Sequence, residues 1–151
     1  MNIMRTISTT KLPYQLNKAG LVSNPTNPEV RLNELAQLKD GWLNGKGRAI
    51  NRNALNALAR AFNKRFDRRL PLPHFYPTPE GGVQAEWTIG DCEISLEFAF
   101  PSLNAKFYAV RLFDKDRKDP FSYQLNLNKD YNWKKLNELL SGVVWFFGAA
   151  S

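Results

Sequence analysis

The chain has 151 residues, of which 43 % are hydrophobic and 13 % aromatic, so it is long and apolar enough for one domain with a core, and a disordered chain is excluded. Its single cysteine, Cys92, excludes an intramolecular disulfide and fits a reducing compartment. No segment has the apolar length of a signal peptide or a membrane span, so we expect a soluble, cytoplasmic protein without membrane contact.

The net charge of +7 is concentrated in one segment of the chain. Residues 46–69 contain eight basic residues and a single acid, Asp67, whereas the rest of the chain is neutral. A basic surface of this density favours partners that carry negative charge, either the backbone of a nucleic acid or an acidic protein.

Residues 1–27 differ from the rest of the chain. They have no apolar periodicity and no acidic residue, and they contain turn formers such as Pro13 and Gly20. We therefore expect an N-terminal arm or loosely attached segment there, followed by a single domain over residues 28–151.

A short helix is predicted to begin at residues 27–29, Asn-Pro-Glu, which supply an N-cap, a proline at the first helical position and an acid in the first turn. Leucines at positions 32, 35 and 38 form one apolar stripe, and we expect the helix to end near Lys39. The glycine-rich loop 40–47 comes next. Its spacing matches neither common phosphate-binding motif, so we expect a connection in which Trp42 packs against the core.

A second helix is predicted over Arg52–Arg69 with Asn51 as its N-cap, because leucine and phenylalanine recur along one side at helical spacing. Cations gather on and beside the other side. The candidate binding residues are Arg52, Arg60, Lys64, Arg65, Arg68 and Arg69. The helix dipole stabilises cations near a C-terminus, but this many exceed that need, and like charges one turn apart repel each other. Three interpretations stay open: a solvated face, contact with a nucleic-acid backbone, and docking on an acidic protein partner.

The fold is organised around a β-hairpin predicted over Val83–Phe100. Apolar and polar residues alternate on both sides of Gly90-Asp91, a pair suited to a two-residue loop because glycine adopts positive φ at its first position. This loop pairs Trp87 with Ile94, and every inward apolar residue then faces another one. A shift by one residue would reverse the faces of a whole strand.

Three further strands complete the predicted sheet. His74–Pro77 is expected at an edge, since proline cannot donate to a central ladder. A strand over Lys106–Phe113 follows the hairpin, with an inward side of Tyr108, Val110 and Leu112. A charged loop over residues 114–120 leads to the last strand, whose inward side is Phe121, Tyr123, Leu125 and Leu127.

The chain is predicted to end in a helix that starts near Asp130. One side of this helix carries Trp133, Leu136, Leu140, Val144 and Phe147. Residues 143–147 are apolar all round, which is more than one packed face needs, so self-association or partner contact through Trp145 and Phe146 is a hypothesis. Together the elements predict an α+β domain: a five-stranded, mostly antiparallel sheet covered on one face by two or three helices.

Three carboxylates, Glu86, Glu93 and Glu97, are predicted to share the outer face of the hairpin, with Glu86 diagonal to the other two. Such a trio is one way to hold Mg²⁺ for phosphodiester chemistry, but no Glu-x-Lys follows on a neighbouring strand as a restriction-type nuclease would prefer. We expect a solvated face, with a protein-contact patch as the first alternative. No metal site is predicted.

Nucleophilic catalysis has only one candidate pair, because His74 is the only histidine and Cys92 the only cysteine. Cys92 falls on the inward side of the hairpin, where an inert thiol is the usual outcome. The chain also has too few nitrogen and sulfur ligands for a zinc site. The sequence therefore predicts no catalytic residue and no cofactor.

Two motifs resemble those of a family of small, uncharacterised bacterial proteins. Residues 40–45 read Asp-Gly-Trp-Leu-Asn-Gly, and residues 77–87 read Pro-Thr-Pro-Glu-Gly-Gly-Val-Gln-Ala-Glu-Trp. These are similar to the family's D-G-W-D-G and P-T-x-D-G-G-I-x-x-E-W. The resemblance covers residues 29–113 and departs from the pattern where Leu43-Asn44 replaces a single Asp and Glu80 replaces another.

The resemblance implies no catalytic residues. Since such proteins are often encoded in small or mobile operons, it implies a role in genetic conflict: toxin neutralisation, defence or counter-defence. With the charge pattern, this predicts a non-enzymatic interaction protein that binds a protein partner through the basic helix and the C-terminal aromatic segment. The alternative is a sequence-nonspecific DNA- or RNA-binding protein that uses the same basic helix.

Overall fold

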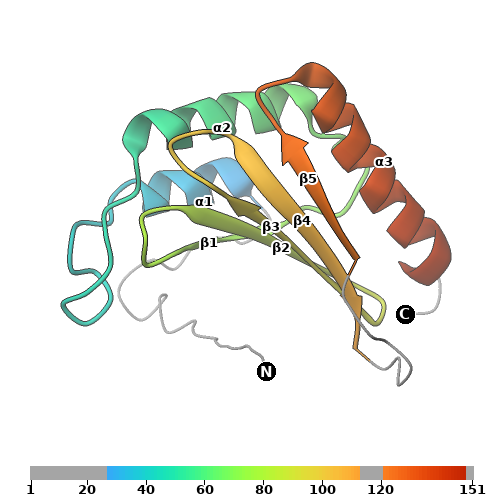
Figure 1. Cartoon of the computed structure of the whole chain (residues 1–151), viewed down its shortest axis with the longest axis horizontal. Coiled ribbons are helices and arrows are strands. Elements are labelled where there is room, and N and C mark those ends of the chain that lie inside the picture. Colours follow the sequence, from blue (N-terminus) through green and yellow to red (C-terminus); the bar gives the residue numbers. More distant parts are fainter. Residues whose placement is uncertain (1–26, 113–120, 149–151) are drawn as a thin grey trace.

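The structure is a computed structural model that describes residues 27–112 and 121–148 (Figure 1). Its elements in chain order are α1 (Pro28–Leu35), α2 (Arg52–Arg65), β1 (His74–Pro77), β2 (Val83–Ile89), β3 (Cys92–Phe98), β4 (Asn104–Arg111), β5 (Phe121–Asn126) and α3 (Asp130–Phe147). Of the expected N-terminal arm, residues 1–26 lie outside the described residues, as does the charged loop 114–120.

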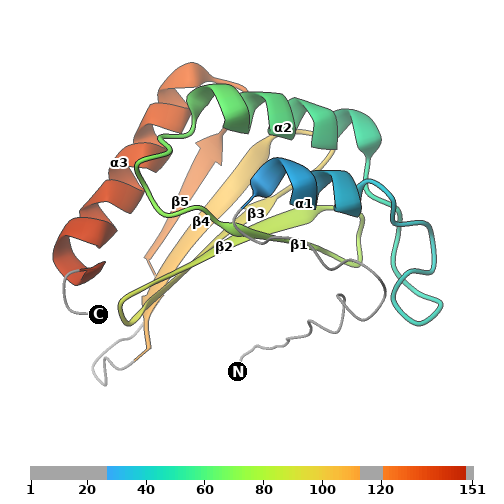
Figure 2. The ribbon, with the colours of Figure 1, turned by 180° about the vertical axis from the view of Figure 1, so that it is seen from behind.

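The five strands form one sheet in the order β1-β2-β3-β4-β5, and each strand is antiparallel to its neighbours. All three helices arch over the same side of this sheet, and no described helix covers the other side (Figures 1 and 2). The α+β prediction is thus confirmed. In the described part of the chain, no helix combines the length and apolarity needed to cross a bilayer.

The hairpin of β2 and β3 has the predicted register. Trp87 pairs with Ile94, and the buried residues alternate with less buried ones along both strands. Gly90 has a φ of +60°, as the tight loop requires. Because every inward residue of the pair is apolar, the hairpin provides the central part of the surface on which the helices pack.

The inward side of β4 is opposite to the prediction. Tyr108 pairs with Ser95 and so lies on the open side of the sheet together with Val110, while Leu112 lies beyond the strand and is exposed. The inward side consists of Ala105, Phe107 and Ala109. Apolar residues occur at both parities in this strand, and pairing of Phe107 with Leu96 of the hairpin decides which set faces the helices.

The last strand has the predicted face, but only half of it is covered. Leu125 and Leu127 are buried at 2 % and 1 % exposure, whereas Phe121 is 50 % exposed and Tyr123 is 39 % exposed. The side-chain nitrogen of Lys135 in α3 lies 5.2 Å from the centroid of the Tyr123 ring. The helices therefore leave the outer half of β5 open.

Both N-terminal helices begin as predicted and end earlier. The side chains of Asn27 and Asn51 accept hydrogen bonds from the amides of Val30 and Ala54, which caps α1 and α2. Beyond α1, tight turns replace the last part of the helix that was expected to end near Lys39. The large apolar side chains that the helices bury are those of Leu32, Leu35, Leu55, Leu58, Phe62, Trp133, Leu136 and Leu140.

The end of α2 at Arg65 instead of Arg69 has a tertiary cause. Phe66 is extended, with φ −72° and ψ 135°. The side chain of Asn137 in α3 accepts a hydrogen bond from the amide of Asp67 at 3.1 Å and donates one to the carbonyl of Arg65 at 3.0 Å. A residue far along the chain thus caps the helix where the local sequence would allow it to continue.

Candidate interaction surfaces

The six basic residues predicted to bind a partner do not form one helical face. Because α2 ends at Arg65, Arg68 and Arg69 belong to the turn that follows it. Arg52 lies at the start of the helix, where its guanidinium donates a hydrogen bond to the carbonyl of Ala36 at 3.1 Å. The predicted continuous stripe over Arg52–Arg69 is therefore wrong in its second part.

Three of these cations have acidic partners within the chain. Arg65 Nη2 lies 2.9 Å from Asp130 Oδ2 at the start of α3. Arg69 Nη2 lies 2.8 Å from Asp67 Oδ2, and this contact is the main cause that lowers the pKa of Asp67. Arg68 is 3.7 Å from Glu29 and also covers the ring of Phe62, which makes it part of the fold.

Arg60 and Lys64 remain, and we call them the basic pair. Both are exposed and one helical turn apart on α2. Within residues 27–112 and 121–148, neither side chain forms a hydrogen bond or an ion pair. Of the six candidate binding residues, only these two thus keep side chains without a hydrogen bond or ion pair to another described residue.

Among the described residues, the two most exposed large hydrophobic side chains lie at the C-terminal end of α3, which we call the aromatic end. It consists of Trp145 and Phe146, which are 81 % and 75 % exposed. A groove of about 820 Å³ lies beside Trp145, and Pro71, Ile89 and Val144 contribute to its lining. Burying a large apolar side chain contributes roughly 1.5–3 kcal/mol, so this pair is a strong contact for a matching surface.

The residue that follows the aromatic end, Phe147, is packed against the hairpin loop and β4. The guanidinium of Arg111 lies 4.7 Å from the centroid of the Phe147 ring and forms an ion pair with Asp91 at 2.8 Å. The hydrogen bond from Arg111 is the main cause that lowers the pKa of Asp91. Gly90 approaches so closely that a Cβ atom there would lie 2.5 Å from the carbonyl oxygen of Phe147.

The basic pair and the aromatic end lie at opposite ends of α3. Arg65, which follows Lys64, contacts Asp130 at the first residue of α3. Trp145 lies fifteen residues further along the helix, which is about 22 Å at roughly 1.5 Å per residue. The two predicted contact regions are therefore separate surfaces.

The three glutamates lie on the open side of the sheet, with the predicted diagonal arrangement. Glu93 accepts a hydrogen bond from Thr88 at 2.7 Å, Glu86 accepts one from Gln84, and Glu97 pairs across the strands with Lys106. Among the described residues, no group of three or more His, Cys, Asp or Glu side chains has the arrangement of a metal site. The carboxylates of Glu86 and Glu93 thus accept hydrogen bonds from neighbours in the sheet, and Glu97 lies opposite a lysine.

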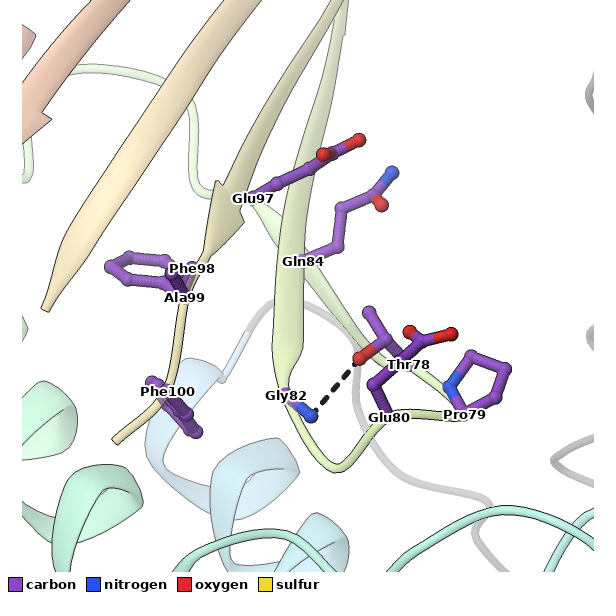
Figure 3. A pocket seen from close by; sticks show the side chains of 9 residues that line it. All are labelled: Thr78, Pro79, Glu80, Gly82, Gln84, Glu97, Phe98, Ala99 and Phe100. Carbon is purple, nitrogen blue, oxygen red and sulfur yellow. Dashed lines mark hydrogen bonds between the residues drawn. The ribbon is translucent and has the colours of Figure 1, made fainter. Parts of the chain in front are cut away.

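A pocket of about 380 Å³ lies where the β1–β2 loop meets β3, and no sequence pattern predicted it (Figure 3). Gln84 and Glu97 extend over it from adjacent strands, and Glu80 lies on the loop. Partial burial is the main cause that raises the pKa of Glu97; Lys106 lowers it and Glu80 raises it further. Oxygen-rich walls suit hydrogen-bond donors, and none of the residues lining this pocket is a histidine, cysteine or lysine.

The motif at residues 40–45 builds a compact loop. The carboxylate of Asp40 accepts a hydrogen bond from the amide of Ala49 at 2.9 Å, and the indole nitrogen of Trp42 donates one to the carbonyl of Arg48 at 3.0 Å. A Cβ atom at Gly47 would lie 2.8 Å from that indole nitrogen. Trp42 is therefore half-buried over its own loop, and the predicted packing against the core is wrong.

The second motif packs on residues 48 and 49, to which Asp40 and Trp42 of the first motif are hydrogen-bonded. The amide of Arg48 donates a hydrogen bond to the carbonyl of Pro79 at 2.9 Å. Gly81 has a φ of +91°, and a Cβ atom there would lie 3.0 Å from the carbonyl of Ala49. The hydroxyl of Thr78 accepts a hydrogen bond from the amide of Gly82 at 3.0 Å, which closes the turn (Figure 3). Residues of both motifs thus join two loops into one corner of the fold.

Comparisons with family models, curated proteins and solved structures found no match to this chain. The resemblance based on the two motifs therefore stays a prediction. What the chain can do has to be inferred from the surfaces described above.

The only candidate nucleophile and base lie on opposite sides of the sheet. Cys92 pairs with Ile89 on the helix side and is 3 % exposed, and burial is the main cause that raises its thiol pKa. His74 pairs with Glu86 on edge strand β1, and its pKa is lowered, mainly by burial. The geometry does not form a Cys–His dyad.

Proposed function

We propose that this chain is a non-enzymatic protein-interaction module whose main contact surface is the aromatic end. The observation that carries the proposal is the exposure of Trp145 and Phe146 on a helix end that the fold holds in place, beside an apolar groove. Tryptophan in particular is enriched among the residues that dominate binding energy at protein interfaces. A partner that buries both rings gains several kcal/mol without reorganising this chain.

The partner that fits is a protein with an apolar pocket for the aromatic end. Acidic groups elsewhere on that protein would meet the basic pair, which attracts the partner at long range. Following the motif resemblance, we place the chain in a bacterial or phage conflict system, as an antitoxin-like inhibitor or as an accessory of defence or counter-defence.

Sequence-nonspecific binding to DNA or RNA is the second candidate. The basic pair favours it, because neither cation is paired with a residue in the described part of the chain. Each phosphate neutralised contributes a slope of about −0.9 to the dependence of log K on log salt. Contact through Arg60 and Lys64 alone gives a slope near −2, against about −5 if all six predicted cations took part. Because three of the six are paired with acids of this chain, only weak nucleic-acid binding is expected.

Purification of the tagged chain from its native host tests the proposal. We compare wild type with W145S/F146S, which removes the aromatic end, and with R60E/K64E, which reverses the basic pair. Since all four side chains are exposed, circular dichroism should show that both variants fold. We expect a protein that co-purifies in constant ratio with wild type and R60E/K64E and is lost with W145S/F146S.

Two results would count against the proposal. One is a partner that W145S/F146S still retains, because the aromatic end would then not be the contact surface. The other is tight binding of labelled DNA or RNA in fluorescence anisotropy, weakened steeply by salt and abolished in R60E/K64E, which would support the nucleic-acid alternative.

A further inference from the structure

The two edges of the sheet differ in how they are protected. At one edge, β1 has only four residues, ends in Pro77 and follows Pro73, so it is a poor template for another strand. At the other edge, β5 has six residues, Phe-Ser-Tyr-Gln-Leu-Asn, with no proline and no charge. Edge strands of this kind pair readily with a further strand unless something covers them.

The hydrogen-bond pattern identifies the free groups on β5. The amide of Leu127 donates to the carbonyl of Leu103 at 2.9 Å, and in an antiparallel ladder such bonded pairs recur at every second residue. Phe121, Tyr123 and Leu125 therefore exchange their main-chain hydrogen bonds with β4. The amides and carbonyls of Ser122 and Gln124 point away from the sheet, and no other described residue bonds to them.

The side chains along this edge are open as well. The first four residues of β5 are all exposed. Phe121 and Tyr123 lie on the helix side of the sheet with stacked rings, 6.4 Å between centroids. An added strand would cover these aromatic side chains and would satisfy the main-chain groups of Ser122 and Gln124.

We propose that β5 pairs antiparallel with β5 of a second copy of this chain, joining the two sheets across a two-fold axis. Placing Tyr123 opposite Tyr123 of the copy puts Ser122 opposite Gln124, and these are the residues whose main-chain groups point outward. The same register brings Phe121 opposite Leu125 on the helix side. Aromatic and apolar residues then face each other on one side and polar residues on the other.

A second copy fits this edge because the strand is complementary to itself. One patch serves both partners, as a two-fold interface requires. The chain carries a net charge of +7, but β5 contains no charged residue, so pairing two copies of this strand brings no like charges opposite each other within it. The inference is independent of the proposed function, since it uses neither the aromatic end nor the basic pair.

Analytical ultracentrifugation of the full chain tests the inference with a matched pair of variants. Q124P removes an amide that points away from β4, so the strand itself should survive, whereas Q124A keeps that amide. We expect wild type and Q124A to reach twice the chain mass of 17.3 kDa with rising concentration, and folded Q124P to stay at that mass. W145S/F146S should associate like wild type.

A wild type that stays monomeric up to its solubility limit, or a Q124P that associates as well as Q124A, would overturn the inference. If Q124P does not fold, amide hydrogen exchange of wild type decides. The amides of Ser122 and Gln124 should become protected as the protein concentration rises. Fast exchange at all concentrations would show that the edge has no partner. Protection only after another protein is added would show that its partner is not a second copy.

Discussion

Substituting Gly90 by alanine should detach the last turn of α3 and weaken the aromatic end. Gly90 has a φ of +60°, and a Cβ atom there would lie 2.5 Å from the carbonyl oxygen of Phe147 and 3.1 Å from its carbonyl carbon. These are backbone atoms, so a side-chain rotation cannot relieve the contact. Either the hairpin loop or the end of the helix has to move.

The magnitude follows from two terms. A left-handed conformation costs a residue other than glycine about 1–2 kcal/mol. Forcing extra volume into a packed contact costs a further 1–3 kcal/mol or so. G90A should therefore lower the free energy of unfolding by roughly 2–5 kcal/mol, which is a decrease in Tm of about 2–4 °C per kcal/mol for a chain of this size.

G45A is the matched control. Gly45 also has a positive φ, +87°, but a Cβ atom there would have no heavy atom within 4 Å. The G45A substitution should therefore lower the free energy of unfolding only by the conformational cost, about 1–2 kcal/mol. We would measure both variants by guanidinium denaturation, and by hydrogen exchange of residues 143–148, which should accelerate in G90A alone. Equal destabilisation of the two variants, or unchanged exchange in G90A, would refute the packing argument.

Two further predictions concern stability. F62A should destabilise the protein by about 3–5 kcal/mol in denaturant unfolding, because Phe62 is 3 % exposed and its ring contacts Phe66, Phe75 and Trp133. The control F146A should stay within about 0.5 kcal/mol of wild type, because Phe146 is exposed. Similar losses in the two variants would contradict the assigned burial. The second concerns pH. Arg111 lowers the folded-state pKa of Asp91 below its ordinary 3.8. The contribution of ionised Asp91 to the free energy of unfolding is therefore complete above pH 3.8 and is lost as the pH falls through the pKa of the folded state. D91N should therefore show a shallower loss of stability than wild type in acid, and identical pH profiles would argue against the Asp91–Arg111 contact.

The parts of the fold that follow from local pattern were predictable from the sequence. The hairpin register could be read because apolar residues alternate without ambiguity on both sides of Gly90-Asp91. The inward side of β4 could not, because apolar residues occur at both parities, and the choice depends on which set meets the hairpin. The end of α2 was missed for a similar reason, since Asn137, a residue from another helix, supplies the cap.

The same distinction applies to the candidate surfaces. The exposure of Trp145 and Phe146 was predictable, because one helix cannot bury apolar residues on every side. The reduction of the basic set was not, because Glu29 and Asp130 pair with arginines that are distant in sequence. The edge position of β1 was predictable from Pro77, whereas the position of β5 at the other edge depends on strand order, which the sequence pattern did not specify.

The distance between the basic pair and the aromatic end determines how a partner would be selected. The start of α3, where Arg65 meets Asp130, lies about 22 Å from Trp145 at roughly 1.5 Å per residue, and at physiological ionic strength exposed charges are screened over about 8 Å. The basic pair can therefore speed the encounter with an acidic protein but adds little to contacts at the aromatic end. The fit around Trp145 and Phe146 then decides which partner stays bound, because the contact of Phe147 with Gly90 and Arg111 fixes the helix end before binding.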